Sequence, residues 1–158
     1  MRVTHRIAAV LLLLCGGLVL AAAPGRIAPS LQPQPQAQEA VPAFHAQAPK
    51  AALPATMSPA LFVDIAVQNA YSIAARIKKT LYQEPCYCHC DQSQGHGSLL
   101  DCYVSRHASG CDICTREAFF SYEQAAKGKT AAQIRAAIIK GDWQSVDLTK
   151  YQKPLPAK

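Results

Sequence analysis

The sequence lacks several features by which protein functions are ordinarily recognised. It has two methionines, one tryptophan and only 7% aromatic residues. No basic run with interleaved aromatic residues occurs, so nucleic acid is not expected as a partner. There is also no Ser/His/Asp grouping, paired carboxylate set or glycine-rich phosphate loop. These absences favour a binding protein over an enzyme.

Two further absences narrow the choice of cofactor. The motif Cys-x-x-Cys-His is missing, so covalently attached c-type haem is not indicated. Met57 is the only methionine after Met1, whereas copper carriers of oxidising compartments often use methionine thioethers. Cysteine thiolates are therefore the only abundant soft donors that the chain offers.

The beginning of the chain is typical of an export signal. Arg2 and Arg6 precede an apolar run over residues 7–20, and residues 21–23 are alanines that suit cleavage. The run is short for a membrane span, which needs about 20 apolar residues. We therefore expect a signal peptide at 1–23 and a periplasmic or secreted protein. An uncleaved membrane anchor is the alternative.

The composition changes after the signal. Residues 24–56 are rich in alanine, proline and glutamine and have little apolar surface to bury, which predicts a disordered, partly extended linker. Residues 57–158 remain for one domain of about 100 residues. That domain has 12 Lys and Arg against 9 Asp and Glu, so its net charge is 12 − 9 = +3, half of the +6 of the whole chain.

The periodicity of the domain predicts helices only. The first helix is expected to open at Ser58-Pro59 and to end at Glu84-Pro85, since serine caps helices well and the residue before a proline avoids helical angles. Its apolar residues recur every three or four positions and form one stripe: Phe62, Ala66, Ala70, Ile73, Ile77 and Leu81.

A loop over residues 86–97 should separate this helix from three shorter ones. Each of the three begins with a capping pair, and the pairs are Ser98 with Asp101, Ser109 with Asp112, and Thr130 with Gln133. Gly128 and Gly141 are expected to end the last two helices, and the lone Trp143 to pack on the core. The fold class is therefore all-α, a small irregular bundle of about four helices with a Cys-rich loop.

Six of the seven cysteines lie between Cys86 and Cys114. Cys86, Cys88 and Cys90 alternate, and a Cys-x-Cys pair makes a strained disulfide but a good chelate for a soft metal. Cys111 and Cys114 lie three apart at an expected helix start, where free N–H groups and the helix dipole lower thiol pKa values. This second pair suits a metal site and a redox site equally.

Three interpretations of this region stay open: a thiolate metal site, thiol–disulfide redox chemistry, and a set of structural disulfides. The crowding favours a metal, because disulfide scaffolds usually scatter their cysteines. We expect the bound metal to be Cu(I), ahead of Zn(II). We expect any membrane or protein partner to belong to an extracytoplasmic metal or redox system. The expected ligands are Cys86, Cys88, Cys90, Cys102, Cys111, Cys114, His89 and His107. His96, between two glycines, is expected on a mobile surface loop.

The hexapeptide Pro85-Cys86-Tyr87-Cys88-His89-Cys90, followed by Cys102 and the pair Cys111 and Cys114, resembles the bacterial family named after its PCYCGC motif, also called CYCXC. The resemblance covers roughly residues 58–140. It implies an exported or lipid-anchored protein without an established function, with selenocysteine in some relatives. The chain departs from the motif at His89, where the name-giving version has glycine. This difference adds a candidate ligand and argues against the need for a glycine conformation there.

Overall fold

The computed structural model describes residues 40–155. This range contains six α-helices, four short 3-10 helices and no strand, which confirms the helical fold class expected from the sequence. None of the helices in this range is long and apolar enough to cross a bilayer. The expected signal peptide at 1–23 and the first part of the expected linker, 24–39, lie outside the described residues.

The first predicted helix is divided into three pieces. Ser58 precedes only a 3-10 turn, η1 (Pro59–Leu61), and makes no side-chain cap bond. Helix α1 (Ile65–Arg76) begins instead after Asp64, whose Oδ1 accepts a hydrogen bond from the backbone N–H of Val67 at 3.0 Å. A break at Ile77 then separates α1 from α2 (Lys78–Leu81). Asp64 directly precedes Ile65, the first residue of α1, so it caps this helix in place of Ser58.

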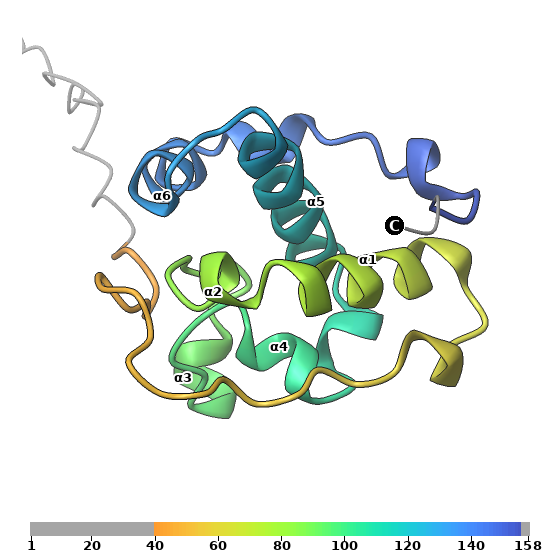
Figure 1. Cartoon of the computed structure of the whole chain (residues 1–158), viewed down its shortest axis with the longest axis horizontal. Helices are drawn as coiled ribbons and strands as arrows, with labels where there is room; N and C mark the ends of the chain where they lie inside the picture. Colours follow the sequence, from red (N-terminus) through yellow and green to blue (C-terminus); the bar gives the residue numbers. More distant parts are fainter. Residues whose placement is uncertain (1–39, 156–158) are drawn as a thin grey trace, which may run out of the picture. The chain divides into compact units, whose positions relative to one another are not determined.

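The predicted apolar stripe of the first helix forms one wall of the core. Five of its six residues are buried, and Ile77, at the break between α1 and α2, is partly buried: the buried five are Phe62, Ala66, Ala70, Ile73 and Leu81. They pack against α5 (Asp112–Ala126). In Figure 1, α1 and α2 lie between α5 and α6 on one side and α3 and α4 on the other. The hydroxyl of the buried Tyr103 donates to the carbonyl oxygen of Cys114 at 2.8 Å and so ties α4 to the start of α5.

The region expected to be one loop contains a helix of its own, α3 (Cys90–Gln94). Helix α4 (Asp101–Val104) carries Cys102, as predicted, but Ser98 and Asp101 do not form its expected cap. The Asp101 carboxylate instead accepts from the backbone N–H of Gly97 at 2.7 Å. The carboxylate therefore closes the turn before the helix rather than the helix itself.

The last two helices end at glycines, as expected. Gly128 follows α5 and Gly141 follows α6 (Ala131–Ile139), with φ values of +77° and +85° that favour glycine. The capping box between Thr130 and Gln133 is present at the start of α6. Helix α5 differs, because its N-cap is Cys111 and not Ser109. The Ser109 hydroxyl donates to the carbonyl oxygen of Arg106 within the turn before it, η2 (His107–Gly110).

The chain closes with two further 3-10 turns, η3 (Asp142–Ser145) and η4 (Leu148–Tyr151). Trp143 lies on η3 and is buried, as predicted. The ring of Tyr151 stacks on the ring of Phe119 with centroids 3.5 Å apart. The C-terminal turns thus pack on the bundle, η3 on α5 and η4 on α1, with Tyr151 reaching Phe119 of α5.

Residues 40–56, placed in the linker by the sequence, have neither helix nor strand but contact the domain at defined points. The backbone N–H of Ala43 donates to the Asp91 carboxylate at 3.1 Å, and the His45 ring stacks on the Tyr82 ring with centroids 3.9 Å apart. The Lys78 ammonium donates to the Pro54 carbonyl at 3.2 Å. Figure 1 shows this segment, in orange and yellow, running along α3 and α4. We call residues 40–56 the strap.

Candidate metal centre

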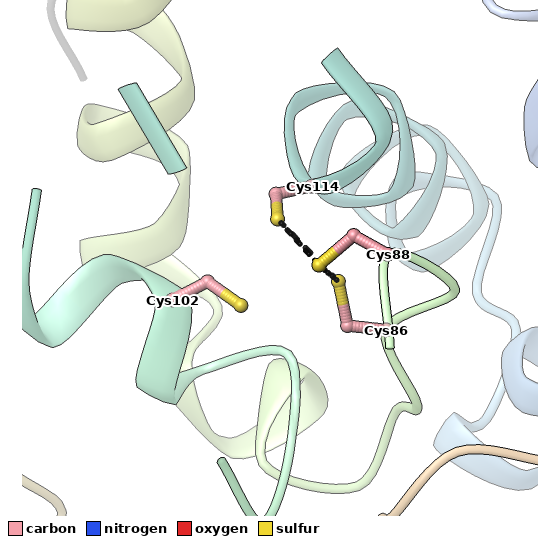
Figure 2. A group of neighbouring side chains, drawn as sticks. All are labelled: Cys86, Cys88, Cys102 and Cys114. Carbon is pink, nitrogen blue, oxygen red and sulfur yellow. Dashed lines mark hydrogen bonds between the residues drawn. The ribbon is translucent and has the colours of Figure 1, made fainter. Parts of the chain in front are cut away.

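Four separate elements bring the six cysteines together. Cys86 and Cys88 lie on the short loop after α2, and Cys90 is the first residue of α3. Cys102 lies on α4, and Cys111 and Cys114 lie at the N-terminus of α5. Figure 2 shows the side chains of Cys86, Cys88, Cys102 and Cys114 pointing toward one another from these elements.

Three of the sulfur atoms form a nearly equilateral triangle. The Sγ of Cys86 lies 3.4 Å from that of Cys88 and 3.4 Å from that of Cys114, and the third edge, from Cys114 to Cys88, is 3.6 Å. A disulfide needs about 2.05 Å, and all six cysteines between 86 and 114 are free thiols. Ligand sulfurs about 2.3 Å from one tetrahedral ion lie about 3.8 Å apart. The triangle is therefore spaced like the ligands of a single ion.

The donors form three sets of four, in each of which all donor atoms lie within 4.8 Å of one another. The sets are Cys86, Cys88, Cys102 and Cys114; Cys88, Cys90, Cys102 and His107; and Cys88, His107, Cys111 and Cys114. All six predicted cysteine ligands and His107 belong to at least one set. A thiolate and histidine site of this composition could hold a metal ion.

The centre is closed on one side and more open on the other. Cys86, Cys90, Cys102 and Cys114 are at most 3% exposed, whereas Cys88, Cys111 and His107 are half-buried. Pro42 and Ala43 of the strap line a small hollow with Cys86, Cys90 and His96. The strap thus covers the inner side of the centre, and Cys111 and His107 face the side with more access to solvent.

The electrostatics favour a thiolate at the middle of the group. Hydrogen bonds from neighbouring thiols, that of Cys102 first, hold the pKa of the Cys88 thiol well below its ordinary value. Hydrogen bonds with Cys102 and Cys114, together with burial, raise the pKa of the Cys86 thiol. The positive end of α5 adds to the stabilisation of negative sulfur near Cys114. The same network lowers the pKa of the Cys102 thiol and raises that of Cys114, so negative charge is favoured on Cys88 and Cys102.

One residue of the site was not found from the sequence. Glu117 is fully buried, and its Oε1 accepts from the backbone N–H of Tyr87 at 2.8 Å. Burial raises the pKa of this carboxyl well above its ordinary value. The bond fixes the loop between Cys86 and Cys88. The sequence did offer one indication of Glu117: it lies three residues after Cys114, which places both residues on one face of α5.

The structure moves one histidine into the site. His96 Nδ1 lies 3.4 Å from the Cys102 Sγ, and the rings of His96 and His107 meet edge-on with centroids 5.1 Å apart. His96 lies on a loop, as expected, but it is half-buried and contacts Cys102 there. Gly95, with a φ of +69°, ends α3 in a left-handed turn that folds the chain back toward α4.

A family model described as a protein of unknown function with PCYCGC motif matches residues 46–155. The chain belongs to this family. The match to the PCYCGC family includes every cysteine of the three donor sets and begins within the strap. Searches of curated proteins and of solved structures found no significant match.

His89 occupies the position where the PCYCGC motif has its glycine. Its φ is +55°, and it is the only non-glycine residue among 40–155 with a positive φ. The chain therefore adopts at His89 the left-handed conformation that glycine favours, contrary to the expectation that no such conformation is needed. His89 belongs to none of the three donor sets, and its ring meets the Tyr87 ring edge-on at 6.0 Å.

Proposed function

We propose that this protein binds Cu(I), ahead of Zn(II), through clustered cysteine thiolates outside the cytoplasm. The observation that carries the proposal is the triangle of free thiols of Cys86, Cys88 and Cys114, with Cys102 close to all three. Three sulfurs at nearly equal separations match a trigonal site, and Cys102 can add a fourth ligand. Soft thiolate donors select Cu(I) and Zn(II) over hard cations.

Two features favour Cu(I) within this pair of metals. The described cysteines outnumber the four ligands that a structural zinc site takes. Cys102 and Cys114 are also fully buried, so an ion bound there is shielded from water. Cu(I) needs such shielding, because exposed Cu(I) is readily oxidised, whereas Zn(II) has no redox chemistry.

Metal binding should depend on pH and should be coupled to the stability of the fold. Each thiol that becomes a ligand releases its proton to solvent, so affinity rises with pH until the ligands are ionised. The ligands come from the loop after α2, from α4 and from α5, so a bound ion joins elements that are distant in sequence. The metal therefore stabilises the folded chain.

Thiol–disulfide exchange is the second candidate function. Its support is the pair Cys90 and Cys102, whose sulfurs lie 3.3 Å apart. A redox pair needs a thiol that a partner can reach, however, and these two residues are 1% and 0% exposed. The pair Cys90 and Cys102 therefore suits metal binding better than exchange, and exchange with a protein partner would have to use the half-buried Cys111 with Cys114, the pair expected from the sequence.

The test is an anaerobic titration of the reduced protein with Cu(I) in competition with a coloured chelator. The protein should withdraw Cu(I) from the chelator, displace bound Zn(II) and lose thiols that react with an alkylating agent. Cys88→Ser and Cys114→Ser should each weaken binding at least about tenfold, an effect of about 1.4 kcal/mol. His45→Ala, a histidine outside the donor sets, is the control for His107→Ala. Folded, reduced protein that takes up no Cu(I) contradicts the proposal.

The location is a separate part of the proposal, supported by the basic start and apolar run before residue 24. Mass spectrometry of the native protein should find an N-terminus created by cleavage near residues 21–23, in material from outside the cytoplasm. An intact chain that begins with Met1 and stays in the cytosol would contradict export.

A further inference from the structure

The three donor sets are not separate sites, because each pair of sets shares two donors. The first and second share Cys88 and Cys102, the first and third share Cys88 and Cys114, and the second and third share Cys88 and His107. Cys88 alone belongs to all three. Adjacent coordination sites that share a donor are the geometry of a metal–thiolate cluster.

We infer that the centre is a multinuclear Cu(I)–thiolate cluster in which the Cys88 sulfur bridges at least two copper ions. The inference rests on the proposed function and adds to it the number of ions and the role of one ligand. One ion lies in the triangle of Cys86, Cys88 and Cys114. A second lies among Cys88, Cys90, Cys102 and His107.

The distances of the second set support its own ion. The sulfurs of Cys90 and Cys102 lie 3.3 Å apart, and His107 Nε2 lies 3.5 Å from the Cys88 sulfur. Neither Cys90 nor His107 belongs to the first set. An ion held by the first set thus leaves two unused donors beside ligands that are already bound.

Burial gives a physical reason for the second ion. Cys90 is 1% exposed and has a ligand sulfur in contact. Without a cation nearby a buried cysteine stays a neutral thiol, and it can bind as a thiolate only where a cation compensates its charge. A second Cu(I) provides that charge for Cys90, and it reduces the negative charge on the shared Cys88 sulfur. Two ions therefore use the buried donors more completely than one.

The loop geometry allows Cys88 to take the central place. It lies midway between Cys86, which belongs to the first set only, and Cys90, which belongs to the second set only. The bond from the Tyr87 N–H to the Glu117 carboxylate anchors this loop to α5. Cys88 is thereby held between the two groups of end ligands.

The experiment loads the reduced, purified chain with Cu(I) without oxygen and measures it by native mass spectrometry and copper X-ray absorption. The wild-type protein should bind at least two copper ions and show a copper–copper scattering component. Cys88→Ser should lose that component and keep at most one ion. His45→Ala, at a histidine outside the three donor sets, should keep two ions and the scattering component.

The outcomes separate this inference from the proposed function. Wild-type protein with one copper ion and no copper–copper scattering overturns the cluster and leaves Cu(I) binding intact. Cys88→Ser protein with two ions and unchanged scattering overturns the bridging role. Protein that binds no copper overturns both. The wild-type measurement alone decides the number of ions, so the test of the cluster does not depend on whether a variant folds.

Discussion

A single backbone angle explains the unusual position in the cysteine hexapeptide. His89 has a φ of +55°, in the left-handed region where the Cβ of most residues clashes with the backbone. Periodicity and spacing carry no information about such an angle, whereas the motif's glycine does. The conformation lets the chain turn from the loop that carries Cys86 and Cys88 into α3, which Cys90 begins.

Substitutions at His89 should change stability according to how well the new residue tolerates this φ angle, and should not change copper binding. His89→Gly relieves the steric cost but frees the unfolded chain, so the free energy of unfolding should stay within about 1 kcal/mol of wild type. His89→Val should lose about 1–2 kcal/mol, because a β-branched residue tolerates this region poorly. Urea unfolding of the metal-free protein measures both. Copper capacity should be unchanged in His89→Gly, and a lost ion would make His89 a ligand.

Tyr71 predicts a loss of stability at high pH. It is fully buried, its hydroxyl donates to the Ser105 carbonyl at 2.7 Å, and burial raises its pKa from 10.0 to about 12. Between pH 10 and 12 the unfolded chain loses the proton that the folded chain keeps, so this residue's contribution is complete below pH 10 and falls toward pH 12.

Tyr71→Phe provides the comparison. At pH 8 it should unfold more easily than wild type by about 1 kcal/mol, the usual value of a lost hydrogen bond. The difference should shrink as the pH approaches 12, because only the wild type has this phenol to ionise. Urea unfolding at both pH values, with reductant present, is the measurement. A difference that stays constant with pH would contradict a raised Tyr71 pKa.

At the residue scale, the cysteine donors were predictable because their spacing is local and their number is high. His96 was not, because the turn at Gly95 that brings it to Cys102 is set by how α3 packs. Glu117 was missed for a related reason, since an acidic residue on a helix is ordinarily exposed. Its burial depends on the backbone N–H of Tyr87, 30 residues earlier in the chain.

At the element scale, caps were predictable only where the helix end depends on neighbours in sequence. The capping box of Thr130 and Gln133 is of this kind. The cap at Ser109 failed because its hydroxyl donates within η2, and the Cys111 sulfur accepts from the Cys114 N–H at 3.5 Å instead. Helix α3 has only five residues, too few for a periodic pattern.

Cys111 caps α5 and is a proposed outer metal donor, and two substitutions separate the cap from the proposed role. Cys111→Ala removes both the cap and the donor, so the free energy of unfolding of the metal-free protein should fall by about 1 kcal/mol. Cys111→Ser keeps a capping oxygen, and serine is a favoured N-cap. Its free energy of unfolding should therefore equal or exceed that of the wild type. Thermal and urea unfolding of the reduced proteins measure this. Equal losses in the two variants would show that the sulfur does not cap α5.

The strap is the element for which composition was least informative. Its alanines and prolines predict a linker, since they carry little apolar surface. Its contacts come instead from a backbone N–H at Ala43 and from the stacking of His45 on Tyr82. These interactions need partners on α3 and next to α2, so they became apparent only with the fold.

At the scale of the whole molecule, the fold brings together donors that are separated by up to 28 residues in the chain. Copper should therefore raise thermal stability. Free Cu(I) at about 100 times Kd adds about 2.7 kcal/mol, which corresponds to an increase in Tm of roughly 10–20 °C for a domain of this size. Calorimetry with and without a Cu(I) chelator tests this. Cys88→Ser combined with Cys114→Ser should show no increase, and an equal increase there would contradict binding at this centre.

The most direct test of thiolate metal binding is the metal content of the anaerobically purified protein, measured together with its free thiols before and after metal removal. We predict copper above zinc, few reactive thiols among the six cysteines of residues 86–114 while metal is bound, and six after chelation in acid with denaturant. Folded protein without metal and without free thiols, which takes up no Cu(I) after mild reduction, would contradict metal binding and show that the cysteines are structural disulfides.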